Sequence, residues 1–194
     1  MARHKGLTFY EKKKKISKDM VREIFSTAFY CFAAILVAFV LVFSFGMKVS
    51  VIGVSMSPAL NNGEEVLINR FVYKIFSPKR GDVIAFLPNG NTNSHYYLKR
   101  VIGLPGERVQ IIGGYVYING EPLVEDEAFD KIADPGIAGT EILLGSDEYF
   151  VMGDNRNASE DSRSGNIGPV SKTVITGQAW FHLGDKETSM GLVE

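Results

Sequence analysis

The stretch RVQIIGGYVYING, residues 108–120, decides what kind of domain this chain forms. Two short runs rich in β-branched and aromatic residues, Arg108–Ile112 and Tyr115–Ile118, flank the pair Gly113-Gly114. Paired glycines adopt the backbone angles of a tight hairpin turn, and Asn119-Gly120 is a further turn signal. The stretch therefore predicts an antiparallel β-hairpin.

The same pattern extends in both directions from this hairpin. From Val49 onward, short runs of Val, Ile, Tyr and Phe alternate with Gly, Pro, Asn and Asp, and long helical periodicity is absent. Met56–Leu60 is expected to form a short helix or turn, and residues 126–139 a loop or a short helix. We predict a mostly β, antiparallel, barrel-like domain. Besides the hairpin, its predicted strands are Lys48–Gly53, Glu65–Asn69, Asp82–Phe86, Tyr96–Gly103, Glu148–Gly153 and Thr176–Leu183.

A different kind of segment precedes the β region. Ile24–Met47 contains no charged residue, and its bulky side chains fall on all faces of a helix. As a helix it would be about 36 Å long, enough to cross a hydrocarbon core of roughly 30 Å with some tilt. A buried globular helix is one alternative. A cleavable secretory signal is another, with Ser44-Phe45-Gly46 as a weak cleavage site, but the stretch exceeds the usual apolar region of such signals.

Charge is distributed unevenly around this segment. Residues 1–23 carry eight Lys or Arg against three acidic residues, whereas the rest of the chain carries 13 basic and 19 acidic groups. The positive-inside rule then places the N-terminus in the cytoplasm and everything after Lys48 on the outer face. The Lys12–Lys15 run could serve as a nucleic-acid tail, but its position before an apolar span favours an anionic membrane surface. An acidic body also argues against a nucleic-acid-binding domain.

These features divide the chain into three parts and exclude some chemistry. We expect a basic cytoplasmic tail over 1–23, a transmembrane helix over 24–47 in the cell membrane and an extracytoplasmic domain over 48–194. The single cysteine, Cys31, lies in the apolar stretch, so no disulfide can form within one chain. No spacing typical of metal ligands appears, and we expect neither metal nor cofactor.

Three segments of the β region carry candidate chemistry. The first, Gly53–Leu60, contains Ser55 about eight residues after the span; taken alone, it is also compatible with a polar turn. The second, Tyr97–Gly106, sets Lys99 in an apolar strand, where Lys99 and Arg100 point to opposite faces. Both could be exposed charges of an edge strand. A buried lysine would instead have a lowered pKa, and its neutral amine could take a proton from a serine hydroxyl.

The third segment, Met152–Gly165, is dense in Asp, Asn, Arg and Ser. A solvated loop with Asx turns would have this composition. Two Arg and two Asp so close together instead suggest paired charges that hold the loop in one shape.

In this order the segments resemble the sequence boxes of bacterial type I signal peptidases. The matching patterns are Ser-Met-x-Pro, Tyr-x-Lys-Arg-Val-Ile-Gly-x-Pro-Gly and Gly-Asp-Asn-Arg-x-x-Ser-x-Asp-Ser-Arg, and Arg80–Phe86 is similar to a fourth box. The resemblance covers about residues 24 to 183. It implies that Ser55 is the nucleophile, Lys99 the general base and Ser159 the group that orients the lysine. It also implies that Asp154, Arg156, Asp161 and Arg163 support the site by charge pairing.

A Ser-Lys dyad needs no histidine, so the resemblance leaves His95 and His182 incidental. The sequence departs from the family pattern at three positions. Gly53 occupies a place where some members have a serine in the oxyanion hole, so the oxyanion would depend on the Ser55 N–H and on Gly53 or water. Ala158 and Ala59 replace a common asparagine and threonine. We expect these departures to change local hydrogen bonds and not the dyad.

By the same resemblance the substrate is a secreted preprotein, cleaved after a small-x-small sequence such as Ala-x-Ala. An extended substrate could add as a strand beside Val49–Gly53, and sharing the membrane would raise its effective concentration. Small pockets would reject bulky side chains. The residues expected to line them are Val51, Ile52, Met56, Leu60, Tyr97 and Leu98.

Two rival readings remain open at this point. A catalytically silent, membrane-tethered β module that binds cell-surface partners would need no Ser55 and Lys99 together. A self-cleaving repressor with a Ser-Lys site would lack a membrane span. The sequence specifies no oligomeric state and no role for 92–95, and we expect 126–139 to be a variable insertion away from the dyad.

Overall fold

The computed structural model describes residues 18–91, 93–125, 129–184 and 189–193. By internal contacts the chain divides into two units, 1–40 and 41–194, each described here by itself. Most of 1–23, the expected cytoplasmic tail, lies outside the described residues.

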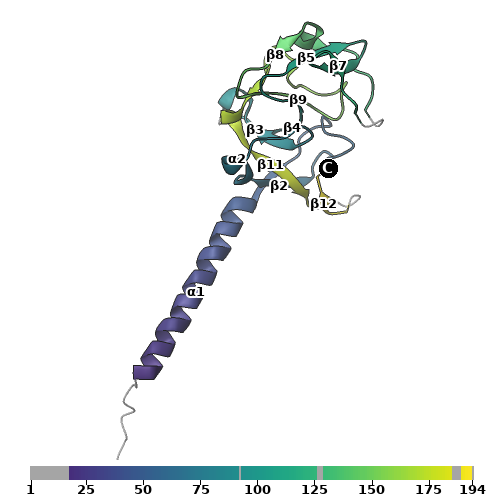
Figure 1. The fold of residues 1–194 in the computed structure, drawn as a ribbon. Coiled ribbons are helices and arrows are strands. Elements are labelled where there is room, and N and C mark those ends of the chain that lie inside the picture. Colours follow the sequence, from purple (N-terminus) through teal and green to yellow (C-terminus); the bar gives the residue numbers. More distant parts are fainter. Residues whose placement is uncertain (1–17, 92, 126–128, 185–188, 194) are drawn as a thin grey trace, which may run out of the picture. The chain divides into compact units, whose positions relative to one another are not determined.

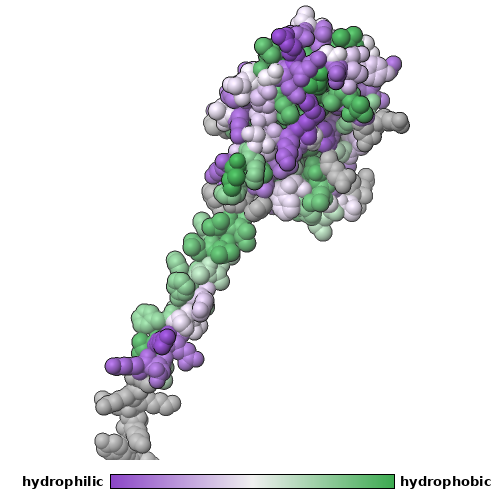
Figure 2. All heavy atoms as spheres, viewed as in Figure 1, coloured by the Kyte–Doolittle hydropathy of each residue, from purple (hydrophilic) through white to green (hydrophobic). Residues whose placement is uncertain are grey.

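The apolar segment forms one helix, α1, over Lys18–Phe45 (Figure 1). Within Lys18–Val42, an 18-residue window has a mean hydropathy of 2.4, and none of that window is buried inside the structure. Figure 2 shows apolar side chains along much of its visible length. The helix begins at Lys18, earlier than the predicted start at Ile24. It ends at Phe45, before the predicted end at Met47, because Met47 and Lys48 already belong to the first strand. Its length and composition suit a membrane span.

The β domain consists of two antiparallel sheets (Figure 1). The large sheet has the order β1-β2-β11-β3-β4-β9-β10, with β12 also paired to β11. Among the described residues no ladder joins β1 to β10, so this sheet is a curled half-barrel and the prediction of a mostly β, barrel-like domain is confirmed. Its strands are β1 Met47–Ser50, β2 Glu65–Asn69, β3 Val83–Phe86, β4 Tyr97–Gly103, β9 Glu148–Met152, β10 Val170–Ser171, β11 Ile175–His182 and β12 Gly191–Leu192.

The small sheet has the order β7-β6-β5-β8 and contains the predicted hairpin. Strands β5 and β6 pair from Val109↔Ile118 to Ile112↔Tyr115, with Gly113 and Gly114 at positive φ between them. The two glycines thus form the tight hairpin turn that the sequence predicted, and this turn sets the register of the two strands. The bounds are β5 Arg108–Ile112, β6 Tyr115–Ile118, β7 Glu121–Pro122 and β8 Ile142–Leu143.

Short helical turns complete the domain: α2 Val72–Ile75, and 3₁₀ turns at Pro88–Gly90, Gly136–Gly139 and Lys172–Val174. Met56–Leu60, the segment expected to be a helix or turn, forms a turn. The core comprises three clusters of buried apolar side chains. One of them contains Val51, Met56, Leu60 and Leu98, which anchors the Ser55 turn and strand β4 on the same apolar base.

Candidate active site

The turn that carries Ser55 follows β1 directly. The Leu60 N–H donates to the Met56 carbonyl at 2.8 Å, and Met56 and Leu60 are both fully buried. At the base of the loop, the Val51 N–H donates to the Glu64 carbonyl at 2.8 Å. Because these apolar side chains anchor the turn, its polar residue Ser55 is left at the surface of the core.

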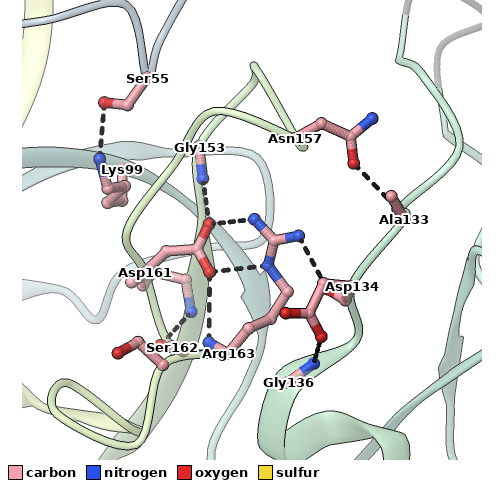
Figure 3. Close-up of polar contacts among 12 residues, drawn as sticks. Ser55, Lys99, Ala133, Asp134, Gly136, Gly153, Asn157, Asp161, Ser162 and Arg163 are labelled. Carbon is pink, nitrogen blue, oxygen red and sulfur yellow. Dashed lines mark hydrogen bonds and ion pairs between the residues drawn. The ribbon is translucent and has the colours of Figure 1, made fainter.

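Lys99 reaches this serine from the middle of β4. The Lys99 side chain is only 4% exposed, and its Nζ lies 2.6 Å from Ser55 Oγ (Figure 3). The residue lies opposite Ile84 of β3, a strand whose four residues are all buried. The structure therefore brings together the two residues expected to form the dyad.

Burial governs the acidity of this amine. Desolvation lowers the pKa of Lys99 from 10.5 to about 8, against the opposing pull of Asp161, Glu160 and Asp154. An ordinary lysine at pH 7 is neutral in only about 0.03% of molecules, whereas a group with a pKa of 8 is neutral in about 9%. Burial thus raises the population of the neutral amine roughly 300-fold.

The loop after β9 is held against the dyad by one buried ion pair. Arg163 Nε and Nη2 donate to the two Asp161 carboxylate oxygens, each at 2.8 Å, and the Gly153 N–H donates to Asp161 Oδ2 at 3.1 Å (Figure 3). Burial alone would raise the pKa of Asp161, but the Arg163 contacts outweigh it and hold the pKa below its ordinary value. The Asn155 N–H also donates to the Ser55 carbonyl at 3.1 Å, which ties the loop to the turn that carries Ser55.

The other two expected charges pair outside the motif. Asp154 accepts two bonds from Arg100, at 2.7 and 2.6 Å. Arg156 is 2% exposed and donates to both carboxylate oxygens of Glu125, at 2.8 and 2.5 Å. Arg100 and Glu125 are therefore supporting residues that sequence reasoning missed.

Two expected contacts differ from what the resemblance implies. The Ser159 hydroxyl is buried, helps to lower the pKa of Asp161, and forms no hydrogen bond with Lys99, so its role in orienting Lys99 stays a prediction. The Gly53 N–H donates to Asn62 Oδ1 at 2.8 Å and is committed there. Of the two expected oxyanion donors, the Ser55 N–H is therefore the better placed, and Gly53 is the weaker candidate.

A hollow of about 160 Å³ opens beside the dyad. Of the residues expected to line it, Val51, Ile52, Met56, Tyr97 and Leu98 do so. Leu60 is not among the lining residues; its side chain packs in the core. The lining also includes residues that sequence reasoning did not assign to it: His95, Tyr96 and Glu160.

His95 was set aside as incidental, yet its ring stacks on Tyr97 with the ring centroids 5.3 Å apart. The alternation of side chains offered a clue, since residues 95, 97 and 99 share one parity along an extended chain.

The segment expected to lie away from the dyad does contact the site loop. Residues 126–128 and Thr92 lie outside the described residues. In the described part of the segment, the Ala133 N–H donates to Asn157 Oδ1 at 2.9 Å, and Arg163 Nη1 donates to the Asp134 carbonyl at 3.3 Å (Figure 3). This part of the segment therefore packs on the supporting loop, and the expectation that 126–139 is a variable insertion away from the dyad stays a prediction.

The fourth box has a structural role. The Asp82 carboxylate accepts the Tyr73 hydroxyl at 2.8 Å, the Lys79 N–H at 2.9 Å and Gln178 Nε2 at 3.1 Å. These bonds fix the start of β3, the strand next to Lys99. Among the described residues, no group of three or more His, Cys, Asp or Glu is placed to hold a metal ion.

A serine hydroxyl in contact with a buried amine, on a β domain that follows an apolar helix, defines the class of membrane-anchored serine peptidases. Residues 24–183 match the family described as signal peptidase, peptidase S26, so the chain belongs to this family. Its activity is that of a signal peptidase I, the removal of signal peptides from preproteins.

Several relatives agree with this assignment. The chain is 37% identical over 155 residues to signal peptidase I P of Bacillus subtilis subsp. natto, covering 74% of this chain and 82% of that one. It is 37% identical over 136 residues to signal peptidase I T of Bacillus subtilis strain 168, covering 66% and 69%. A crystal structure of a signal peptidase I from Enterococcus faecalis matches at 31% identity with a TM-score of 0.41, over 54% of this chain and 97% of that one.

Proposed function

We propose that Ser55 is the nucleophile and Lys99 the general base of this signal peptidase, acting on the outer face of a bacterial membrane. The observation that carries the proposal is the 2.6 Å contact between the Ser55 hydroxyl and a lysine that is 4% exposed. Neutral Lys99 takes the Ser55 proton while Oγ attacks the scissile carbonyl carbon.

The remaining steps use the same two groups. Protonated Lys99 gives its proton to the leaving amine, and the signal peptide stays bound to Ser55 as an ester. Lys99 then takes a proton from water, which attacks the ester carbonyl carbon. Lys99 returns this proton to Ser55 Oγ as the bond between the acyl carbon and Oγ breaks, and the signal peptide leaves with a free carboxyl group. The Ser55 N–H donates to the oxyanion in both steps.

The edges around the hollow support binding of an extended substrate after a small-x-small sequence. Strand β1 is the outermost strand of its sheet, and the segment 51–54 continues from it. Across the hollow, β9 pairs with β4 only between Arg100 and Gly103, so on that side Tyr97 and Leu98 form no ladder among the described residues. A substrate strand can bond to such free edges, and a hollow of about 160 Å³ favours small side chains.

The proposal includes a topology. The basic N-terminal residues 1–23 lie in the cytoplasm, the helix crosses the membrane, and residues 48–194 form the catalytic domain outside. A single cysteine at Tyr115, introduced in a Cys31→Ser background, should react in intact cells with a maleimide that cannot cross membranes. A cysteine at position 4 should react only after lysis, and the reverse pattern would refute the orientation.

The catalytic test compares cleavage of an Ala-x-Ala preprotein by the full chain in detergent. Ser55→Ala and Lys99→Ala should each lose at least about 10³-fold in kcat/KM, as for removal of a member of other catalytic units. Ser57→Ala in the same turn and Lys74→Ala at the surface are matched controls that should retain activity. Full activity in Lys99→Ala would overturn the base and direct attention to His95 or His182. Absence of cleavage by the folded wild type would favour the silent binding module.

A further inference from the structure

Glu160 is a charged residue at the site to which neither the fold nor the resemblance assigns a role. It occupies the variable position of Ser-x-Asp, between Ser159 and Asp161. The Glu160 side chain is exposed and lines the hollow that contains Ser55 and Lys99. It also lines a second hollow, of about 410 Å³, together with Ser159, Asp134 and Arg163. Glu160 therefore stands at the border between the two hollows.

The Glu160 carboxylate is held in place at this border. The Tyr97 hydroxyl donates to Glu160 Oε2 at 3.2 Å. The Tyr97 ring is in turn fixed by stacking on His95, with centroids 5.3 Å apart, and lies 5.5 Å from Lys99 Nζ. The carboxylate is thus tied to the wall of the hollow next to the dyad.

The surrounding charges leave this carboxylate uncompensated during catalysis. Two charged residues, Lys99 and Glu160, line the first hollow. His95 lines it too and is the other side chain there that can carry a positive charge. Lys99 must be neutral to act as a base, so it then offers Glu160 no countercharge. In the second hollow, Arg163 is bound to Asp161 and Arg156 to Glu125, while the Asp134 carboxylate accepts the Gly136 N–H. Both hollows therefore favour a cation from the substrate.

The border position indicates which part of the substrate meets Glu160. The first hollow, with its buried apolar lining, suits the small residues before the scissile bond. The chain after the scissile bond must leave the dyad in the other direction, where the second hollow begins at Ser159 and Glu160. We infer that Glu160 is a specificity-determining residue that favours a basic side chain at the first or second residue of the mature protein. This inference rests on the proposed function of Ser55 and Lys99.

The test uses the full chain in detergent and quenched peptides with one Ala-x-Ala site. Lys, Gln or Glu is placed at the first or the second position after the site. Wild-type enzyme should cleave one Lys peptide about two- to five-fold faster in kcat/KM than its Gln counterpart, the range of an exposed ion pair. The ratio should approach one in Glu160→Gln and invert toward the Glu peptide in Glu160→Lys. In 1 M salt, where the Debye length is about 3 Å, the wild-type ratio should shrink.

Glu121 is an exposed residue of the small sheet, so Glu121→Gln is the matched control and should keep the wild-type ratio of Lys to Gln peptide cleavage. A wild-type ratio of one at both positions, or the same ratio in Glu160→Gln, would overturn the inference. Equal loss of all three peptides in Glu160→Gln would also overturn it, because Glu160 would then act on the dyad and not on selection. Failure of the proposed dyad would be seen separately. In that case Ser55→Ala would cleave the Gln peptide as fast as the wild type does.

Discussion

A single methyl group added at Gly153 should impair catalysis while the protein stays folded. A Cβ atom at this position would overlap the Ser55 carbonyl oxygen and the Ser159 hydroxyl, and would lie 2.6 Å from Ser159 Cβ. Carbon atoms in contact are normally about 3.5–4.0 Å apart. Because one obstacle is the backbone of the nucleophile turn, the overlap cannot be relieved by rotating a flexible side chain. We therefore expect Gly153→Ala to displace Ser55 from Lys99 by about 1 Å.

This displacement sets the expected size of the effect. A misplacement of about 1 Å in an active site can reduce the rate about 100-fold. Overpacking a filled site costs about 1–3 kcal/mol of stability, which in a domain of this size lowers Tm by roughly 2–10 °C. Gly153→Ala should thus remain folded at 25 °C and yet lose about two orders of magnitude in kcat/KM.

The assay measures kcat/KM on an Ala-x-Ala peptide together with Tm, for wild type, Gly153→Ala and Gly165→Ala. Gly165 is the matched control, because a Cβ there meets only Ile137 Cγ2, at an ordinary 3.9 Å. Its variant should match the wild type in both measurements. Activity of Gly153→Ala within about threefold of wild type would refute the argument, and so would a loss of activity that appears only above its Tm.

Three further outcomes follow from the buried charges. The kcat/KM of the wild type should fall about tenfold per pH unit as pH drops below about 8, because protonation of Lys99 removes the base; a flat profile from pH 6 to 9 would contradict this role. Lys99→Met should be inactive but more stable than wild type by ~3 kcal/mol at pH 7 in urea unfolding followed by Trp180 fluorescence. The Lys99 pKa is lowered on folding, so the penalty is complete below pH 8 and disappears toward pH 10.5, where the two proteins should converge; a less stable Lys99→Met would refute the penalty. Asp161→Asn should lower the free energy of unfolding by about 3–5 kcal/mol, because Arg163 loses its buried counterion. Glu141→Gln, which breaks an exposed ion pair with Arg108, should lower it by less than about 1 kcal/mol. Equal losses of stability in the two variants would show that burial does not set the difference.

Local sequence patterns predicted the longer strands well. Strands β2, β5 and β6 have the predicted bounds, because alternating apolar residues and clear turn signals mark both ends. Strands β7, β8, β10 and β12 were missed, since two residues are too few to show a period. The placement of β11 between β2 and β3 was also beyond local reasoning, because it depends on pairing between residues about 100 positions apart.

The site was predicted unevenly for a related reason. Ser55 and Lys99 were identified through the order of the boxes, because neither residue alone has a local pattern that marks it as catalytic. The charges of the third box were correctly expected to pair, but only Asp161 and Arg163 pair within it. The partners Arg100 and Glu125 lie 54 and 31 residues away, where proximity in sequence gives no indication.

Lys99 and Arg100 show that the group which each side chain contacts, more than burial alone, decides whether a basic residue in this strand keeps its charge. The two residues are adjacent in β4 and point to opposite faces, as strand alternation requires. Arg100 meets a carboxylate in a two-point ion pair, which stabilises its charge and commits it to structure. Lys99 meets a hydroxyl, with the carboxylates of Asp161 and Asp154 each bound to an arginine. Because the Asp161 and Asp154 charges are already compensated by arginines, burial outweighs the attraction of these carboxylates and of Glu160, and the pKa of the amine falls toward neutral pH.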